Sequence, residues 1–500
     1  MRNALVRIAI LGMALGLVVI SACARVPLPR SEPIPLDAAL SMRLEPAART
    51  LDSAIAAGAA PGAVLAVSLG GRHFEHSIGQ LAVDDQRPPD GRTIYDMASL
   101  TKVISLTTLA MMAVHEHRIE LDTPVVRYLP GFARGSGEKS RVTVRDLLLH
   151  DSGLPPDPVP PLWKHPGSRR SAMDEALAAN LDTIPGVRML YSDLSAITLG
   201  AIIEQRYHER LDALFAERVA RPLGFTRMRY LPPREWRDEI APTEIEAVPG
   251  RPTTALRGEV HDENAWRLEG VSGHAGLFGD ADDLLRFGEW VLAGAQGRTY
   301  LGSLQPPIEL ATWTVRQNQP EGSSRALGWD TPSDNSSAGH FMSAQSFGHT
   351  GYTGTSIWVD PTRDIVIVLL TNRVHAAKAQ RPVRIIADVR SDLSDAAVLA
   401  VTDGPNPVLA MPDAFRADAE IGWTAPKPVR CSRVRSHSRT RVRCTAVKSH
   451  SKSSRSSKAS RSSKSRKASA THHSSASSVK KSKKTSTKKH TTSSRKSHKG

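Results

Sequence analysis

The sequence predicts an α+β fold in which helices are inserted between two β-hairpins. The stretch GAVLAVSLGGRHFEHSIGQL predicts the first hairpin, because Gly70-Gly71 joins two strand-like runs. The second covers residues 355–370, with Asp360-Pro361 in its turn. Helical patterns fill most of the chain between them. Strands gathered at both ends of a domain favour an α+β layer with a helical insertion over a doubly wound parallel sheet.

The expected helices follow in chain order. Residues 46–58 predict a helix that leads into the first hairpin. Residues 100–114 are apolar on nearly every side, which predicts a central, buried helix. A helix with an Asp-rich first turn is expected to start near Asp280, and residues 382–399 predict a final amphipathic helix.

The N-terminus has the features of an export signal. Two arginines precede an apolar stretch over residues 8–20, which is short for a membrane-spanning helix. The residues that follow, Ile20-Ser21-Ala22-Cys23, resemble the lipobox of bacterial lipoproteins, in which the signal is cut before an acylated cysteine. We therefore expect a signal peptide over residues 1–22 and a lipidated spacer over residues 23–45. The protein would be exported and anchored on the periplasmic side of a membrane, the outer membrane in a Gram-negative cell. An ordinary cleaved signal with an incidental cysteine is the alternative.

The C-terminal tail carries the net charge of the chain. Residues 425–500 hold 24 lysines and arginines and no acidic residue, which leaves 42 basic and 50 acidic residues in the rest. The tail has few large apolar side chains, so we expect it to be disordered after a linker over residues 403–424. Such a tail could bind polyanions. A disulfide between Cys431 and Cys444 is left open, and no structural zinc spacing is present in the sequence.

Ser99 and Lys102 lie three residues apart at the start of the apolar helix. Residues i and i+3 share a helix face, so both can point into one pocket. A serine hydroxyl needs a neighbour that accepts its proton, and a lysine can do so only when neutral. We therefore expect burial to lower the pKa of Lys102. Ser-x-x-Lys alone is a weak signal, and a capping serine beside a lysine that reaches solvent is the alternative.

Two further stretches give the serine–lysine pair a context. Tyr191-Ser192-Asp193 follows about 90 residues later, and His349-Thr350-Gly351 opens the second hairpin. Together with Ser99 and Lys102 they resemble the three motifs of the serine β-lactamase and D-Ala-D-Ala-peptidase superfamily, especially its penicillin-binding-protein-like and class C relatives. The resemblance covers residues 46–402 and implies a mainly antiparallel sheet flanked by helices, with a helical subdomain.

The resemblance also implies roles for individual residues. Ser99 would be the acylated nucleophile, Lys102 its base, and Tyr191 the group that passes a proton to the leaving group. His349, Thr350 and Gly351 would line the substrate-binding wall. The backbone N–H of Tyr352 would join that of Ser99 in the oxyanion hole. The resemblance implies neither a cofactor nor a metal.

Two of the motif positions raise questions of charge. Asp193 stands where the family usually has Asn, and its carboxylate could pair with Lys102 and hold it protonated. His349 could bind a substrate carboxylate when protonated, so KM for an anionic substrate would worsen between about pH 6 and 8. A nearby Asp193 would raise the pKa of His349. His261, Asp262 and His274 are expected to hold their own loop in place rather than to act in catalysis.

The predicted function is hydrolysis through an acyl-enzyme on Ser99. The substrate expected from the resemblance is a cell-wall peptide, as for a DD-carboxypeptidase. A carboxylesterase or weak β-lactamase is the alternative with the same chemistry. A surface-anchored polyanion-binding protein is the alternative from another class. The oligomeric state stays open.

Overall fold

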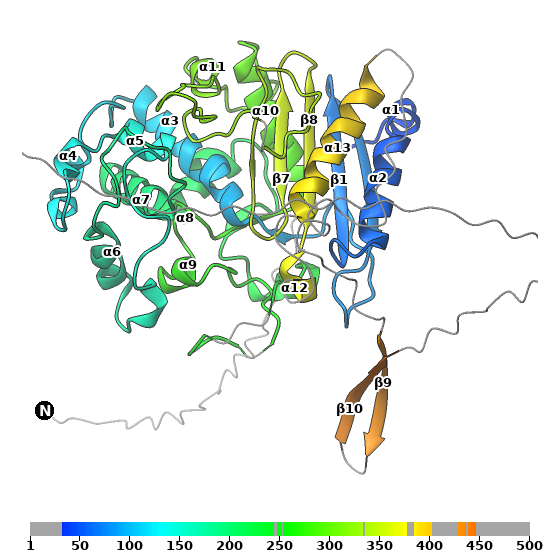
Figure 1. Cartoon of the computed structure of the whole chain (residues 1–500). Helices are drawn as coiled ribbons and strands as arrows, with labels where there is room; N and C mark the ends of the chain where they lie inside the picture. Colours follow the sequence, from blue (N-terminus) through cyan, green and yellow to red (C-terminus); the bar gives the residue numbers. More distant parts are fainter. Residues whose placement is uncertain are drawn as a thin grey trace, which may run out of the picture. The chain divides into compact units, whose positions relative to one another are not determined.

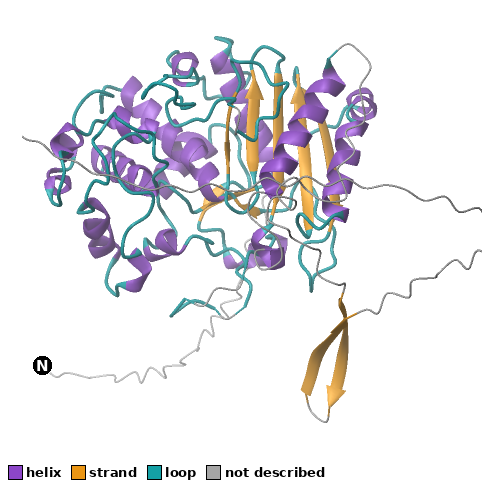
Figure 2. Ribbon diagram, viewed as in Figure 1, coloured by secondary structure: helices purple, strands orange, loops and turns teal. Residues whose placement is uncertain are grey.

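The computed structural model in Figures 1 and 2 describes residues 33–244, 248–252, 254–333, 336–377, 385–402, 429–436 and 439–446. The expected signal peptide, Cys23 and the linker lie outside the described residues. The chain divides into two units, residues 1–426 and 427–500.

A five-stranded antiparallel sheet forms one side of the first unit (Figure 2). Its strand order is β2-β1-β8-β7-β6. The strands are β1 (Gly62–Leu69), β2 (Arg72–Gly79), β6 (Phe347–Thr350), β7 (Ser356–Asp360) and β8 (Ile365–Thr371). The first hairpin therefore pairs with the last one, because β1 lies beside β8 with Ala63 opposite Thr371.

Helices cover both faces of this sheet, so its central strands are mostly apolar. In β1, Leu65 and Val67 pack with α2 (Glu45–Ala56) and α13 (Ile385–Val401). The alternate residues Val64 and Ala66 belong to the core that includes α10 (Ala281–Ala295). Side chains of a strand point alternately to its two faces, and a strand buried on both faces needs apolar residues at every position.

The helical part lies beside the sheet and carries the central helix (Figure 1). A 3₁₀ turn, Ala98–Leu100, leads through a π-helical segment, Lys102–Thr107, into α3 (Thr108–His115). Around it lie α4 (Val125–Tyr128), α5 (Val144–Leu149), α6 (Arg169–Leu177), α7 (Asp193–Tyr207), α8 (Leu211–Phe215), α9 (Glu263–Arg267) and α11 (Leu310–Trp313), and α12 (Val374–Ala377) follows β8. Residues 98–115 are long and apolar enough to cross a membrane, but 83% of that stretch is buried inside the protein. It is a core helix, as the sequence predicted.

A second, small sheet connects the two parts. It has the order β3-β5-β4, formed by β3 (Tyr95–Asp96), β5 (Leu277–Gly279) and β4 (Arg229–Tyr230). β3 ends two residues before the 3₁₀ turn and fixes where the central helix begins.

The predicted α+β architecture is confirmed. Both hairpins form with the expected turns, and α2 lies where residues 46–58 predicted a helix. Asp280 caps α10 by accepting a hydrogen bond from the Asp283 N–H. The described part of the last helix, α13, starts at Ile385 and buries the expected apolar side.

The expected spacer over residues 23–45 needs correction. Residues Ala38–Arg43 form helix α1, capped by the Asp37 carboxylate, and Leu40 and Leu44 are buried against α2 and the sheet. The folded domain therefore begins before residue 46. The Pro-rich sequence around these two leucines did not indicate that they belong to the helical layer on this face of the sheet.

The expectation of a tail without structure needs the same correction in one place. Strands β9 (Val429–Ser436) and β10 (Arg439–Ala446) form an antiparallel pair in the second unit. Valine and threonine recur in this stretch, and β-branched residues favour extended backbone. The register places Cys431 opposite Cys444, while the disulfide itself stays a prediction.

Removing the Leu44 side chain should destabilise the domain although this residue lies in the expected spacer. Leu44 is 0% exposed. Leu44→Ala should lower the free energy of unfolding by about 2–5 kcal/mol, measured by urea denaturation. Met42→Ala is the matched control, because Met42 is 76% exposed and its loss should change stability by less than about 0.5 kcal/mol. Equal effects of the two substitutions would show that α1 does not belong to the core.

Candidate active site

Ser99 lies in the tight turn between β3 and the central helix. Ala98, just before it, has a φ of 47°, a left-handed conformation that is uncommon for residues other than glycine. The buried Asp96 carboxylate holds this turn, since its Oδ1 accepts from the Ala98 N–H at 2.8 Å and its Oδ2 from the His261 N–H at 2.7 Å. Backbone strain of this kind persists only where neighbouring contacts maintain it.

Lys102 is 2% exposed, and its ammonium contacts three acceptors. Nζ lies 2.9 Å from Ser99 Oγ, 3.0 Å from the His274 carbonyl oxygen and 2.7 Å from Asp193 Oδ1. The first two contacts are hydrogen bonds and the third is an ion pair. The contact with Asp193 is the ion pair that the sequence suggested for this departure from the family motif.

The expected lowering of the Lys102 pKa is wrong. Burial is the largest single influence and does lower the pKa, but Asp193 and the Tyr191 hydroxyl together outweigh it and raise the pKa of Lys102 above its ordinary value. A carboxylate at 2.7 Å stabilises the charged form more than burial disfavours it. Lys102 is therefore an ammonium at neutral pH.

Tyr191 lies between two cations and two imidazole rings. Lys102 Nζ is 5.1 Å and Arg325 Cζ 5.2 Å from its ring centroid, within the range of cation–π attraction. The His150 and His349 rings lie 4.5 and 5.9 Å away. These contacts place the phenol beside the serine–lysine pair, as the resemblance implied.

His150 positions Tyr191 through the backbone on either side of it. The Leu190 N–H donates to the His150 carbonyl at 2.7 Å, and the Ser192 N–H donates to His150 Nδ1 at 3.1 Å. Nδ1 can accept only in a neutral imidazole. Burial, Arg325 and Lys102 lower the pKa of His150 well below its usual value, so that form is the one present.

The strand that carries the third motif is packed directly on the nucleophile turn. Gly351 lacks a side chain where a Cβ would lie 2.7 Å from the Met97 carbonyl oxygen. Two hydroxyls fasten the contact, from Thr353 to the Asp96 carbonyl at 2.8 Å and from Thr355 to the Met97 carbonyl at 3.2 Å. This close approach brings Thr350, Gly351 and Tyr352 to the cavity beside Ser99.

The expectation that His349 titrates between about pH 6 and 8, and binds a substrate carboxylate when protonated, is wrong. His349 is buried, and burial, Arg325 and Lys102 together lower its pKa well below the usual value. Its Nδ1 lies 2.9 Å from the Thr350 carbonyl oxygen, which can only accept, so Nδ1 carries the proton and Nε2 is unprotonated. Asp193 pairs with Lys102 and does not raise the pKa of His349.

These residues surround a cavity of about 290 Å³. It is lined by Ser99, Tyr191, Arg325, Asp330, His349, Thr350, Gly351, Tyr352, Ile386 and Arg390. The sequence analysis missed Arg325, Asp330 and Arg390 because they belong to no motif. In the sequence, Arg325 and Asp330 are marked only by their position about 20 residues before the His-Thr-Gly strand.

A group of potential metal ligands lies next to Lys102 and includes its partner Asp193. Among the described residues, Asp193, Asp262 and His274 bring ligand atoms within 4.8 Å of one another. Asp262 Oδ1 contacts His274 Nε2 at 2.8 Å and also caps α9, and Asp193 pairs with Lys102. Asp262 outweighs the effect of burial and raises the pKa of His274, which favours the charged form of that imidazole. His261 likewise contacts Glu244 through Nε2.

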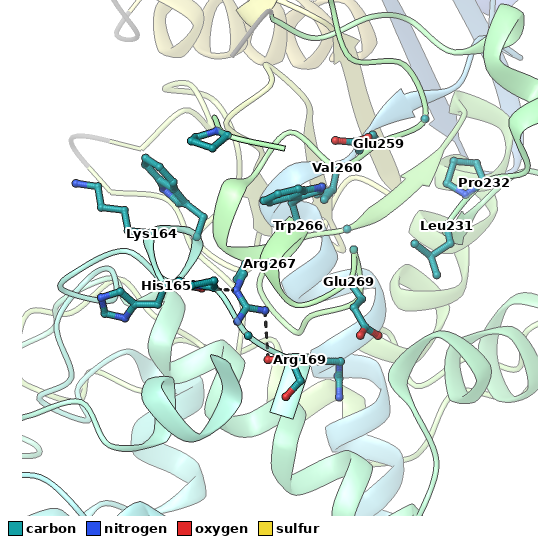
Figure 3. A pocket seen from close by; sticks show the side chains of 18 of the residues that line it. Lys164, His165, Arg169, Leu231, Pro232, Glu259, Val260, Trp266, Arg267 and Glu269 are labelled. Carbon is teal, nitrogen blue, oxygen red and sulfur yellow. Dashed lines mark hydrogen bonds between the residues drawn. The ribbon is translucent and has the colours of Figure 1, made fainter. Parts of the chain in front are cut away.

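Figure 3 shows a second cavity, which is larger, with a volume of about 1110 Å³. None of its lining residues lines the cavity beside Ser99, which we call the serine cavity. Trp163, Trp266 and Leu231 form part of its apolar wall. Arg267 borders it, but its guanidinium donates to the carbonyl oxygens of His165 and Ser168. Size alone does not make this cavity the reaction site, because the groups able to form a covalent intermediate surround Ser99.

Comparisons with known proteins agree with this geometry. Residues 47–390 match the family model described as Beta-lactamase. A protein of Salmonella enteritidis PT4, named as a candidate D-alanyl-D-alanine carboxypeptidase, is 32% identical over 310 residues, which cover 57% of this chain and 71% of that protein.

Solved structures show the same fold. A penicillin-binding-protein homologue from Caulobacter crescentus has a TM-score of 0.56 and 21% identity, covering 72% of this chain and 97% of its own. EstCE1, a hydrolase with promiscuous acyltransferase activity, has a TM-score of 0.55 and 23% identity, covering 72% of this chain and 98% of its own. With a family model that spans more than half of its length and a relative above 30% identity, the chain belongs to the beta-lactamase family of serine hydrolases.

Proposed function

We propose that the protein releases the C-terminal D-alanine of cell-wall peptides through an acyl-enzyme on Ser99. The observation that carries this proposal is the 2.9 Å contact between Ser99 Oγ and Lys102 Nζ at the wall of the cavity. The candidate carboxypeptidase from Salmonella, matched over most of its length, supports a D-alanyl peptide as the substrate.

A proton relay follows from the protonated state of Lys102. Lys102 cannot accept the Ser99 proton while it holds all three of its own. Its Nζ contacts both Ser99 Oγ and Asp193 Oδ1, so it can pass one proton to the carboxylate as it receives the serine proton. Ser99 then attacks the peptide carbonyl and forms the acyl-enzyme.

Tyr191 acts as the proton donor for the departing amine. Its hydroxyl belongs to the group around Lys102, so it can deliver a proton to the leaving nitrogen and later help a water molecule attack the ester. His150 keeps Tyr191 in place for both steps. The backbone N–H groups of Ser99 and Tyr352, residues that both line the cavity, would stabilise the developing oxyanion.

Ser99→Ala should abolish release of D-alanine and labelling by a fluorescent penicillin. Because the nucleophile is lost, kcat should fall by about 10³- to 10⁶-fold. Ser53→Ala is the control, since Ser53 lies on α2 and only bonds its own helix backbone. A Ser99→Ala protein that kept most of its turnover would disprove the acyl-enzyme proposal.

Asp193→Asn should make turnover depend on the deprotonation of Lys102, because the relay then has no carboxylate that can accept a proton. Removing the carboxylate also removes the main influence that raises the pKa of Lys102, so burial then dominates and the pKa falls. Neutral Lys102 must accept the Ser99 proton directly. In the variant, kcat/KM for a chromogenic ester should therefore rise with pH through this lowered pKa, whereas the wild type, whose relay uses the ionised carboxylate, should not show that rise.

The control for this effect is Asp174→Asn, which removes a surface carboxylate that faces Arg134. It should leave the pH profile unchanged. If Asp193→Asn kept the wild-type profile and showed no such rise, Asp193 would not take part in the proton relay.

We also propose that Cys23 carries a lipid anchor that holds the enzyme at a membrane. The support is the lipobox-like sequence Ile20-Ser21-Ala22-Cys23 after an apolar stretch. Cys23→Ser should move the protein from the membrane fraction to the soluble fraction without loss of turnover. Failure of the wild type to incorporate labelled fatty acid in its expression host would reject the anchor.

A further inference from the structure

Arg325 is a buried cation without a full set of partners at the serine cavity. It is 9% exposed and lines the cavity together with Ser99 and Tyr191. Its Nε and Nη1 atoms are buried and have no hydrogen-bond partner. Leaving a buried guanidinium unsatisfied is costly, which indicates that an anionic group completes the site.

Carboxylates already present do not satisfy this guanidinium. Asp330 Oδ1 lies 4.0 Å from Arg325 Nε, beyond hydrogen-bond distance. That oxygen already accepts from Ser324 Oγ at 2.8 Å and from the Thr331 N–H at 3.1 Å. Asp193 is paired with Lys102.

The backbone around Arg325 is held firmly. Its carbonyl accepts from the Gln317 N–H at 2.9 Å, and its N–H donates to Ser323 Oγ at 3.2 Å. The turn that follows is tied to the motif strand, because Asp330 and Gly348 exchange two backbone hydrogen bonds of 2.9 Å. The guanidinium is therefore preorganised beside His349, so little conformational freedom is lost when an anion binds.

The two other nitrogen-bearing candidates at the cavity, His349 and Arg390, are less suited than Arg325 to bind an anion. His349 presents an unprotonated Nε2, which would repel a carboxylate. Arg390 has one buried unpartnered nitrogen, Nε, but its Nη2 donates to the carbonyl oxygens of Gly351 at 2.7 Å and Thr355 at 2.8 Å, and so holds the motif loop.

We propose that the Arg325 guanidinium binds the free carboxylate of the substrate, so that the enzyme selects acyl donors ending in a carboxylate over neutral esters and amides. This inference rests on the proposed function, in which the leaving D-alanine carries that carboxylate. Arginine suits the task because its planar, permanently charged group matches carboxylate geometry. Arg325 supplies the positive charge that the His-Thr-Gly motif lacks in this chain.

The test compares an N-acylated peptide ending in D-Ala-D-Ala with the same peptide amidated at its C-terminus. In the wild type, kcat/KM should be higher for the acid than for the amide. In Arg325→Gln the acid-to-amide ratio should fall about 10- to 150-fold, the range for a hydrogen bond to a charged group. Arg325→Lys should give an intermediate ratio, because it keeps the charge without the planar donors.

Arg298→Gln is the matched control, since Arg298 pairs with Asp364 at the surface. It should leave the ratio unchanged. If Arg325→Gln lowered turnover of acid and amide by the same factor, Arg325 would act through the fold or through Tyr191 and the inference would be wrong. An unchanged ratio would also overturn it.

A binding measurement separates this inference from the proposed function. If the wild type hydrolysed neither peptide, the proposed function would fail, and calorimetry on Ser99→Ala would still decide the role of Arg325. The acid should bind more tightly than the amide to Ser99→Ala, and this difference should disappear in Ser99→Ala/Arg325→Gln. Equal affinity of Ser99→Ala for the two peptides would contradict the inference.

Discussion

The three contacts of the Lys102 ammonium connect the separate parts of this site. They reach Ser99 on the same helix, Asp193 at the start of α7 and the His274 carbonyl in the loop after α9. A buried charge persists only where its partners are all in place. The positions of the central helix, of α7 and of the loop before β5 are therefore coupled through one nitrogen atom, and the nucleophile shares that coupling.

Charge at the cavity follows from the same pairing. Asp193 neutralises Lys102 locally, while Arg325 at the cavity keeps two buried nitrogens without hydrogen-bond partners. Two buried histidines lie close to these cations, and both are neutral because burial, reinforced by the neighbouring positive charge, lowers their pKa. His150 uses its neutral form to hold Tyr191, and His349 shapes the wall without contributing charge. The Asp at position 193 thus changes how the whole cavity is charged.

Much of this arrangement could be predicted from short-range sequence patterns. The spacing of Ser99 and Lys102, the hairpin turns and the order of the three motifs indicated which segments meet, and the structure brings them together. Arg325, His150 and helix α1 escaped prediction because their importance depends on contacts between distant segments. The pKa of Lys102 was predicted with the wrong sign because burial was weighed without the 2.7 Å contact to Asp193, although the pairing itself was foreseen. The pKa of His349 was predicted too high, because its burial beside Arg325 cannot be read from the motif.

The charge of Lys102 can be measured directly by NMR. In protein labelled with ¹³C-lysine, the Lys102 Cε resonance can be assigned by its absence from the spectrum of Lys102→Arg. We expect this resonance to keep the chemical shift of a charged ammonium throughout a titration up to at least the ordinary lysine pKa of about 10.4. A titration midpoint below about pH 9 would show that Lys102 is a neutral base in the resting enzyme, and would contradict the ion pair on which this account of the site depends.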